Sequence, residues 1–103
     1  MIQVHTTCPD LDTARMLAST ALEARLAACA NITPGILSLF HWQGRIEEET
    51  EVSLTLKTRA AHRDSLMSLL QDEHPYDLPV ITWHDLSAGS DAEAWVSEET
   101  GGD

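Results

Sequence analysis

The residues with the greatest chemical potential in this sequence are a cysteine, a histidine and a lysine that lie far apart along the chain. Cys29 stands in the run Arg25-Leu26-Ala27-Ala28-Cys29-Ala30-Asn31-Ile32, where an apolar helical pattern passes into a strand-like one. A thiol in this place could bind a soft metal, act as a nucleophile or fill space in the core. We expect core packing first and a place in the wall of a ligand pocket second, because the negative end of a helix disfavours the reactive thiolate.

The histidine belongs to His74-Pro75-Tyr76-Asp77-Leu78-Pro79, in which two prolines hold an imidazole, a phenol and a carboxylate in a restricted, extended backbone. Rigid presentation of such groups suits a binding site, and mixed nitrogen and oxygen donors suit Cu(II) or Ni(II) better than Ca(II). The segment equally suits a structural connector in which Tyr76 packs its ring and His74 caps a helix. Because no Cys or His pair has a chelating spacing such as C-x-x-C, the sequence supports only a weak metal site.

The lysine, Lys57, is flanked by Leu56 and Thr58 in a strand-like segment. A lysine inside a strand is costly unless it forms an ion pair or binds an anion. Its ion-pair partner would be one of the glutamates that alternate along the same segment, from this subunit or another. As an anion-binding residue, Lys57 would act with Trp42 and Tyr76 on a planar ligand.

Changes in the spacing of apolar residues predict the elements that position these groups. A first strand covers residues 2–7, and Asp10 caps a helix whose apolar face ends at Cys29. That face consists of Leu11, Ala14, Ala18, Leu22, Leu26 and Cys29. Thr33-Pro34-Gly35 interrupts the pattern, and Gln43-Gly44 forms the turn of a hairpin. The later elements are strands at 36–42, 45–58 and 79–86, a helix at 59–73, a last helix opened by the capping box Ser90-Asp91-Ala92-Glu93, and a frayed tail at 101–103.

The element order β-α-β-β-α-β with a terminal helix predicts a ferredoxin-like α+β domain. A chain of 103 residues suits a single domain covering residues 1–103. An antiparallel sheet with helices on one face leaves its other face and both edges in need of cover. The hairpin arms, at roughly ten residues, are longer than usual. We therefore expect the hairpin to join subunits of an oligomer.

The charge balance excludes several classes of partner. The chain has 6 Lys and Arg residues against 17 Asp and Glu residues, a formal net charge of −11 at pH 7. Such a field repels phosphate backbones and anionic lipids, so we expect no nucleic-acid partner and no membrane partner. No run approaches the ~20 apolar residues of a membrane span, and no basic and apolar leader precedes the first strand. We therefore expect a cytoplasmic protein.

Several spaced motifs together resemble the CutA family of divalent-cation tolerance proteins over nearly the whole chain. They agree with the family in order and in spacing, which makes the resemblance specific. The motifs are Arg25-Leu26-Ala27-Ala28-Cys29-Ala30-Asn31-Ile32, Pro34-Gly35, Ser38 with Trp42, Gly44-Arg45-Ile46-Glu47-Glu48, Glu51-Val52, Lys57-Thr58 and His74-Pro75-Tyr76.

The resemblance implies a ferredoxin-like subunit assembled as a compact homotrimer, in which the long hairpin joins strands of neighbouring subunits. It also implies a polar ligand pocket near the subunit interface. The residues of this chain that correspond to the pocket are Cys29, Trp42, Glu47, Glu51, Lys57, His74 and Tyr76.

Copper binding is described for some bacterial members of the family, through a cysteine near the end of the first strand and two adjacent histidines before the proline. This chain has Thr6 at the cysteine position and Glu73-His74 in place of the histidine pair. His74 is thus the one metal ligand that the resemblance carries over.

The sequence therefore indicates a cytoplasmic, trimeric divalent-cation tolerance protein that requires no cofactor and binds copper or another divalent cation weakly. We expect no catalytic activity, since an enzyme would need Cys29 as nucleophile and His74 as its base brought together by the fold. Two alternatives remain open. One is a signalling module that binds a small anionic metabolite at the subunit interface, and the other is a trimeric scaffold that clusters partners without a ligand of its own.

Overall fold

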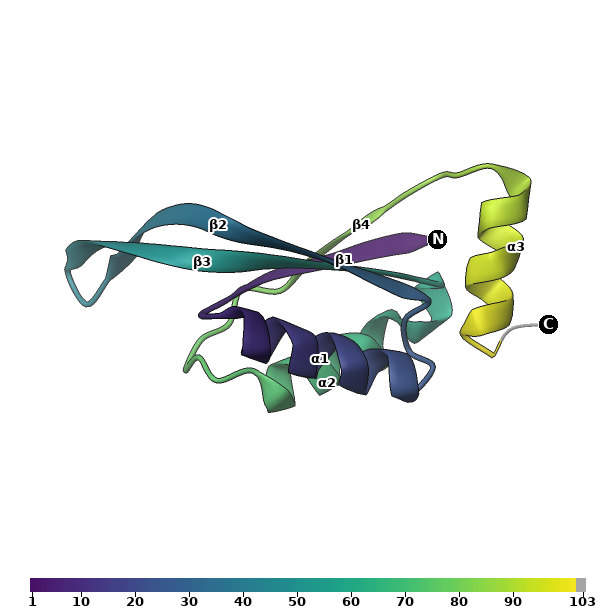
Figure 1. Ribbon diagram of the computed structural model, residues 1–103, viewed down its shortest axis with the longest axis horizontal. Coiled ribbons are helices and arrows are strands. Elements are labelled where there is room, and N and C mark those ends of the chain that lie inside the picture. Colours follow the sequence, from purple (N-terminus) through teal and green to yellow (C-terminus); the bar gives the residue numbers. More distant parts are fainter. Residues whose placement is uncertain (102–103) are drawn as a thin grey trace.

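The computed structural model describes residues 1–101 and shows a four-stranded antiparallel sheet with two helices, α1 and α2, on one face (Figure 1). The strand order is β2-β3-β1-β4, and the predicted α+β class is confirmed. Within residues 1–101, no helix has the length and apolar character needed to cross a membrane. The elements are β1 (Ile2–Cys8), α1 (Leu11–Glu23), β2 (Cys29–Trp42), β3 (Arg45–Thr58), the 3-10 turn η1 (Ala60–His62), α2 (Arg63–Glu73), β4 (Thr82–Asp85) and α3 (Ser90–Glu99).

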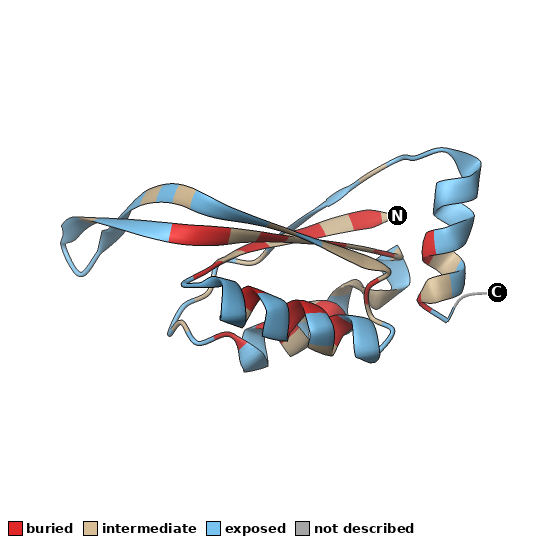
Figure 2. Ribbon diagram, in the orientation of Figure 1, coloured by how far each residue is buried: buried red, intermediate tan, exposed pale blue. Residues whose placement is uncertain are grey.

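The core lies between the sheet and its two covering helices. In β1 every second side chain is buried, from Ile2 to Cys8, because successive residues of a strand point to opposite faces (Figure 2). The alternation continues in β3, where Val52, Leu54 and Leu56 face the same core. The helices contribute Ala14, Leu17, Ala18, Ala21, Leu66 and Leu70.

Helix α1 begins at a side-chain N-cap and ends in a backbone C-cap motif. The side chain of Asp10 accepts a hydrogen bond of 2.7 Å from the backbone N–H of Thr13, which confirms the predicted N-cap. At the other end Arg25 takes a left-handed conformation with φ 59°. Its N–H donates to the carbonyl of Leu22 and the next N–H, of Leu26, donates to that of Ala21, each at 3.0 Å, which is a Schellman motif.

The prediction that Cys29 ends the apolar face of the first helix is therefore wrong. The helix ends at Glu23, and Cys29 is the first residue of β2. Leu22, counted in that face, is 38% exposed. The helical spacing persists in the sequence because Leu26 and Ala27 pack on the core from the connection that follows the helix. An arginine at the left-handed position gave no signal that the helix stops.

The β2–β3 hairpin has arms of 14 residues each, longer than expected, and projects beyond the covering helices (Figure 1). Its turn is confirmed at Gln43 and Gly44, whose φ values of 49° and 78° suit the two-residue turns that match strand twist. The predicted break at Thr33-Pro34-Gly35 is wrong. The strand passes through it with a register shift between Thr33 and Ile36, because a bulge accommodates the proline and the glycine at φ 79°.

The second half of the chain differs from the prediction mainly in its boundaries. α2 ends at Glu73 as expected, because His74 precedes a proline and has ψ 135°. It begins only at Arg63, since residues 60–62 form the tighter turn η1. Strand β4 is four residues long rather than the eight predicted, and it pairs with β1.

Helix α3 stands at the end of the sheet near the N-terminus (Figure 1). Its N-cap is Gly89 rather than the predicted Ser90, and no side chain caps it. Its last turn is held by arginines: Arg59 donates to the hydroxyl of Thr100 at 3.0 Å and to its carbonyl at 3.2 Å, and Arg25 donates to the carbonyl of Glu99 at 3.1 Å. Of the tail predicted to fray, residues 102 and 103 lie outside the described residues.

Candidate functional site

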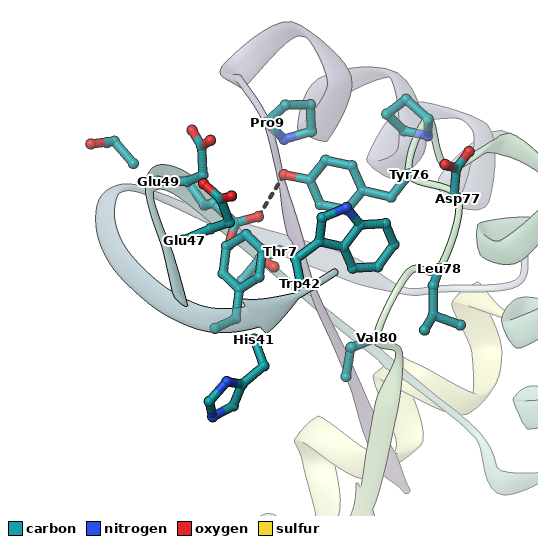
Figure 3. A pocket seen from close by; sticks show the side chains of 14 residues that line it. Thr7, Pro9, His41, Trp42, Glu47, Glu49, Tyr76, Asp77, Leu78 and Val80 are labelled. Carbon is teal, nitrogen blue, oxygen red and sulfur yellow. Dashed lines mark hydrogen bonds between the residues drawn. The ribbon is translucent and has the colours of Figure 1, made fainter. Parts of the chain in front are cut away.

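A cleft of about 670 Å³ lies between the half of the hairpin nearest its turn and the segment that follows α2 (Figure 3). The end of β1 forms its floor, and the hairpin and that segment form its two walls. The lining residues are Thr7, Pro9, Phe40, His41, Trp42, Glu47, Glu49, Thr50, Glu51, Pro75, Tyr76, Asp77, Leu78 and Val80.

The hairpin wall is acidic along one strand and aromatic along the other. Glu47, Glu49 and Glu51 alternate along β3 and so share one face. Phe40 lies directly opposite Glu47 in the register of the two strands, and Trp42 follows two residues later on the same face. Carboxylates and aromatic rings are thereby presented side by side (Figure 3).

The opposite wall carries Tyr76, whose hydroxyl donates a hydrogen bond of 2.5 Å to Oε2 of Glu51. Burial, the hydrogen bond to Glu51 and the charge of that carboxylate together raise the pKa of Tyr76 well above its ordinary value. The phenol therefore remains protonated and acts as a donor. Glu51 itself is only 6% exposed, although it lies on the strand face that elsewhere is open to solvent.

His74 lies behind this wall, 7% exposed, and holds the connector in place. Its Nδ1 accepts a hydrogen bond of 3.2 Å from the backbone N–H of Tyr76, which assigns the ring proton to Nε2. Nε2 then donates to the carbonyl of Thr7 at 2.9 Å and lies 3.4 Å from Oγ1 of Thr6. The His74 ring also packs on the Tyr76 ring, with 4.7 Å between centroids. His74 thus fixes the orientation of Tyr76.

These contacts do not fit the copper site that the family resemblance implies. A metal ion could use a nitrogen of His74 only if a hydrogen bond to Tyr76 or to Thr7 were broken. Oγ1 of Thr6, at the family's cysteine position, donates to the carbonyl of Val80 at 3.0 Å. The nearby thiol of Cys8 is fully buried, and burial with the charges of Asp10 and Glu51 raises its pKa to about 11. Among residues 1–101 no group of three or more Cys, His, Asp or Glu side chains is placed to hold a metal ion.

Two of the predicted pocket residues lie apart from the cleft within one subunit. Cys29 and Lys57 are cross-strand partners at the base of the hairpin. The ammonium group of Lys57 donates to the side-chain oxygen of Asn31 at 3.3 Å. Lys57 is six residues beyond Glu51 along β3, a distance of about 20 Å at the rise of a strand. A single subunit therefore brings together Trp42, Glu47, Glu51 and Tyr76, with His74 behind them.

Several lining residues were not among the predicted pocket residues, and the sequence contained a signal for some of them. Glu49 lies between Glu47 and Glu51 in the alternation of β3, and Phe40 precedes Trp42 by two residues in β2. The period of two would have placed both in the cleft. Leu78 belongs to the segment 74–79 that the sequence offered as a binding site, whereas nothing in the sequence pattern pointed to Val80, which reaches the cleft through the path of the connector after α2.

The fold and the site define a small ferredoxin-like protein with a projecting hairpin and a cleft between the outer half of that hairpin and the segment after α2. Residues 2–99 match the family described as CutA1 divalent ion tolerance protein. The chain belongs to the CutA1 divalent ion tolerance family.

Individual relatives agree with this assignment. A divalent-cation tolerance protein CutA from Pectobacterium atrosepticum is 39% identical over 92 residues, which cover 88% of this chain and 84% of the relative. The solved structure of CutA from Xylella fastidiosa has a TM-score of 0.92 at 35% identity and covers 96% of both chains. A CutA from Archaeoglobus fulgidus, described as a periplasmic divalent cation tolerance protein, has a TM-score of 0.92 at 33% identity, covering 97% of this chain and 99% of its own.

Proposed function

We propose that this protein acts in divalent-cation tolerance as a cytoplasmic homotrimer whose subunits join through the β2–β3 hairpin. The observation that carries the assembly is the apolar face of the hairpin. Leu37, Leu39 and Ile46 are 63%, 61% and 69% exposed on an element that projects from the domain. Exposed apolar patches of this kind mark interaction surfaces. Membership of the CutA1 family supports the tolerance role.

The edges of the sheet further support an assembly. β2 and β4 occupy the two edges, and β2 presents 14 residues with one side unpaired in the single chain. Long exposed edge strands are normally paired or covered. A second subunit would cover both the edge and the apolar face of the hairpin. We include neither nucleic acid nor membrane among the partners, because of the net charge of −11.

The assembly is tested by sedimentation of the wild type and of Leu39→Glu at micromolar concentration. Leu22→Glu is the matched control, because Leu22 is also exposed but lies on α1, away from the hairpin. We expect a trimer for the wild type and the control, and monomers for Leu39→Glu because a buried carboxylate would oppose contact. A monomeric wild type would reject the proposal.

We propose further that the protein requires no cofactor and that Cu(II) binds only weakly. Both nitrogens of His74 are engaged, which supports a structural role for this residue. We also propose that the chain has no catalytic activity. Cys29 pairs with Lys57 at the base of the hairpin whereas His74 contacts the end of β1, so a Cys–His nucleophile pair is not formed within one subunit.

A second candidate function is small-ligand binding, and the cleft favours it. Pockets of several hundred Å³ with apolar walls and a few polar groups are typical of ligand sites. The sequence suggested an anionic ligand held by Lys57 with Trp42 and Tyr76. In one subunit Lys57 lies apart from both aromatic residues, and the cleft between them is lined by carboxylates.

A further inference from the structure

The cleft between the hairpin and the Tyr76 segment has an unbalanced negative charge. Four carboxylates line it, those of Glu47, Glu49, Glu51 and Asp77, and no lysine or arginine does. Arg45 forms an ion pair of 3.5 Å with Glu47, but it is 78% exposed at the rim. Within residues 1–101, neither Glu49 nor Asp77 forms an ion pair.

The excess of negative charge is least favourable at Glu51, because this carboxylate is buried. Its side chain is more than nine-tenths buried, and its only hydrogen bond in the described chain comes from the neutral phenol of Tyr76 to Oε2. Oε1 has no partner in residues 1–101 and belongs to a side chain that lines the cleft. A buried carboxylate is strongly disfavoured unless a cation compensates it. A cation in the cleft would therefore stabilise Glu51, and no lysine or arginine of the same subunit lines the cleft.

The surroundings of these carboxylates suit an organic cation better than a metal ion. Metal ions need several donors converging on one point, whereas successive glutamates on one face of β3 are about 7 Å apart. Trp42 and Tyr76 face the same space (Figure 3). Aromatic faces attract ammonium groups and pack against methylene chains. Four or five methylene groups separate two amines by about the spacing of Glu49 and Glu51.

We propose that this cleft binds a linear aliphatic amine with two or more ammonium groups, held by Glu49 and Glu51 with its methylene chain between Trp42 and Tyr76. This inference goes beyond the proposed trimeric tolerance function, because the residues that it uses, Trp42, Glu49, Glu51 and Tyr76, come together within one subunit. The proposed ligand is a cation, whereas the sequence suggested an anion.

Calorimetric titration of the full chain with 1,5-diaminopentane and with spermidine tests the proposal, with uncharged 1,5-pentanediol as the control ligand. We expect both amines to bind and the diol not to bind. Glu49→Gln and Glu51→Gln should each weaken amine binding about tenfold, the effect of one charge-assisted hydrogen bond. Glu51→Gln retains an oxygen that can accept the phenol of Tyr76, so it removes the charge with least disturbance of the wall.

Two matched variants separate the cleft from general surface attraction. Glu48→Gln removes the same charge from the opposite face of β3, where the side chain does not line the cleft. Trp95→Leu changes an exposed tryptophan of α3, whereas Trp42→Leu changes the aromatic wall. We expect less than a twofold effect from the two control variants and a loss of about three- to tenfold from Trp42→Leu. Equal losses for Glu48→Gln and Glu49→Gln would overturn the proposal.

Lys57→Gln decides whether the ammonium group comes from a free amine or from another copy of the chain. Lys57 is the sole lysine of the sequence. If a second subunit inserted Lys57 into the cleft, calorimetry would detect no amine binding to the wild type but would detect binding to Lys57→Gln. This result would refute the proposal. Absence of binding in both proteins also refutes it. Sedimentation of the same samples keeps the tests separate, since amine binding by a monomer would contradict only the proposed assembly.

Discussion

Thr58 and Thr6 offer a paired test of the energetics of this core. Both side chains face inward and are essentially inaccessible, at 0% and 1% exposure. The hydroxyl of Thr58 has no hydrogen-bond partner among residues 1–101. A buried hydroxyl without a partner costs about 1–3 kcal/mol, and valine has almost the same shape without the polar atom. We therefore expect Thr58→Val to raise the free energy of unfolding by about 1 kcal/mol.

The matched variant is Thr6→Val, which makes the same chemical change in the neighbouring strand. The hydroxyl of Thr6 donates to the carbonyl of Val80 at 3.0 Å and lies 3.4 Å from Nε2 of His74. Loss of these contacts should lower the free energy of unfolding by about 1 kcal/mol. The two variants should therefore differ by about 2 kcal/mol with opposite signs.

Urea denaturation at one fixed protomer concentration measures both effects, because the stability of an oligomer depends on concentration. A shift of the midpoint without a change of slope identifies a change in stability. If Thr58→Val destabilised the protein as much as Thr6→Val, the hydroxyl of Thr58 would have a partner in solution. That result would refute the reasoning.

Two further predictions concern metal binding and pH. Titration with Cu(II) should give equally weak binding to the wild type, to His74→Gln and to the exposed-histidine control His84→Gln, because both ring nitrogens of His74 are hydrogen-bonded. A loss of Cu(II) affinity confined to His74→Gln would instead identify His74 as a ligand. The pKa of Cys8 is raised to about 11 from 9.0, so its neutral thiol stabilises the fold fully below pH 9, and this contribution is lost as the pH rises toward 11. Cys8→Ala should show a smaller loss of unfolding free energy over that interval in denaturation at a series of pH values; an unchanged slope would reject this assignment.

The sequence predicted those parts of the fold that depend on local chemistry. Asp10 could be recognised as a cap and His74 as the end of a helix, because a side-chain acceptor and a following proline act on adjacent backbone. The end of α1 was not predictable, because Arg25 adopts a left-handed conformation that glycine normally occupies. The bulge at Pro34-Gly35 was also missed, since only the pairing partner in β3 shows that the strand continues.

The candidate site was predictable in its residue types but not in its grouping. Trp42, Glu51 and Tyr76 meet because the hairpin and the connector after α2 pack together across the end of β1, a contact between segments far apart in the chain. Lys57 belongs to the same strand as Glu51 but lies at its other end. Spacing along the sequence could not separate these two neighbourhoods without the register of the sheet.

The left-handed arginine that ends α1 has a second role at the far end of the chain. From this conformation the Arg25 side chain reaches α3, where it contacts both the carbonyl and the carboxylate of Glu99, at 3.1 and 2.9 Å. Glycine would relieve the backbone but would remove this anchor. The residue at position 25 therefore affects two helix ends: the backbone strain at the end of α1 and the attachment of α3, 74 residues later. The residue with the least backbone strain need not give the most stable fold.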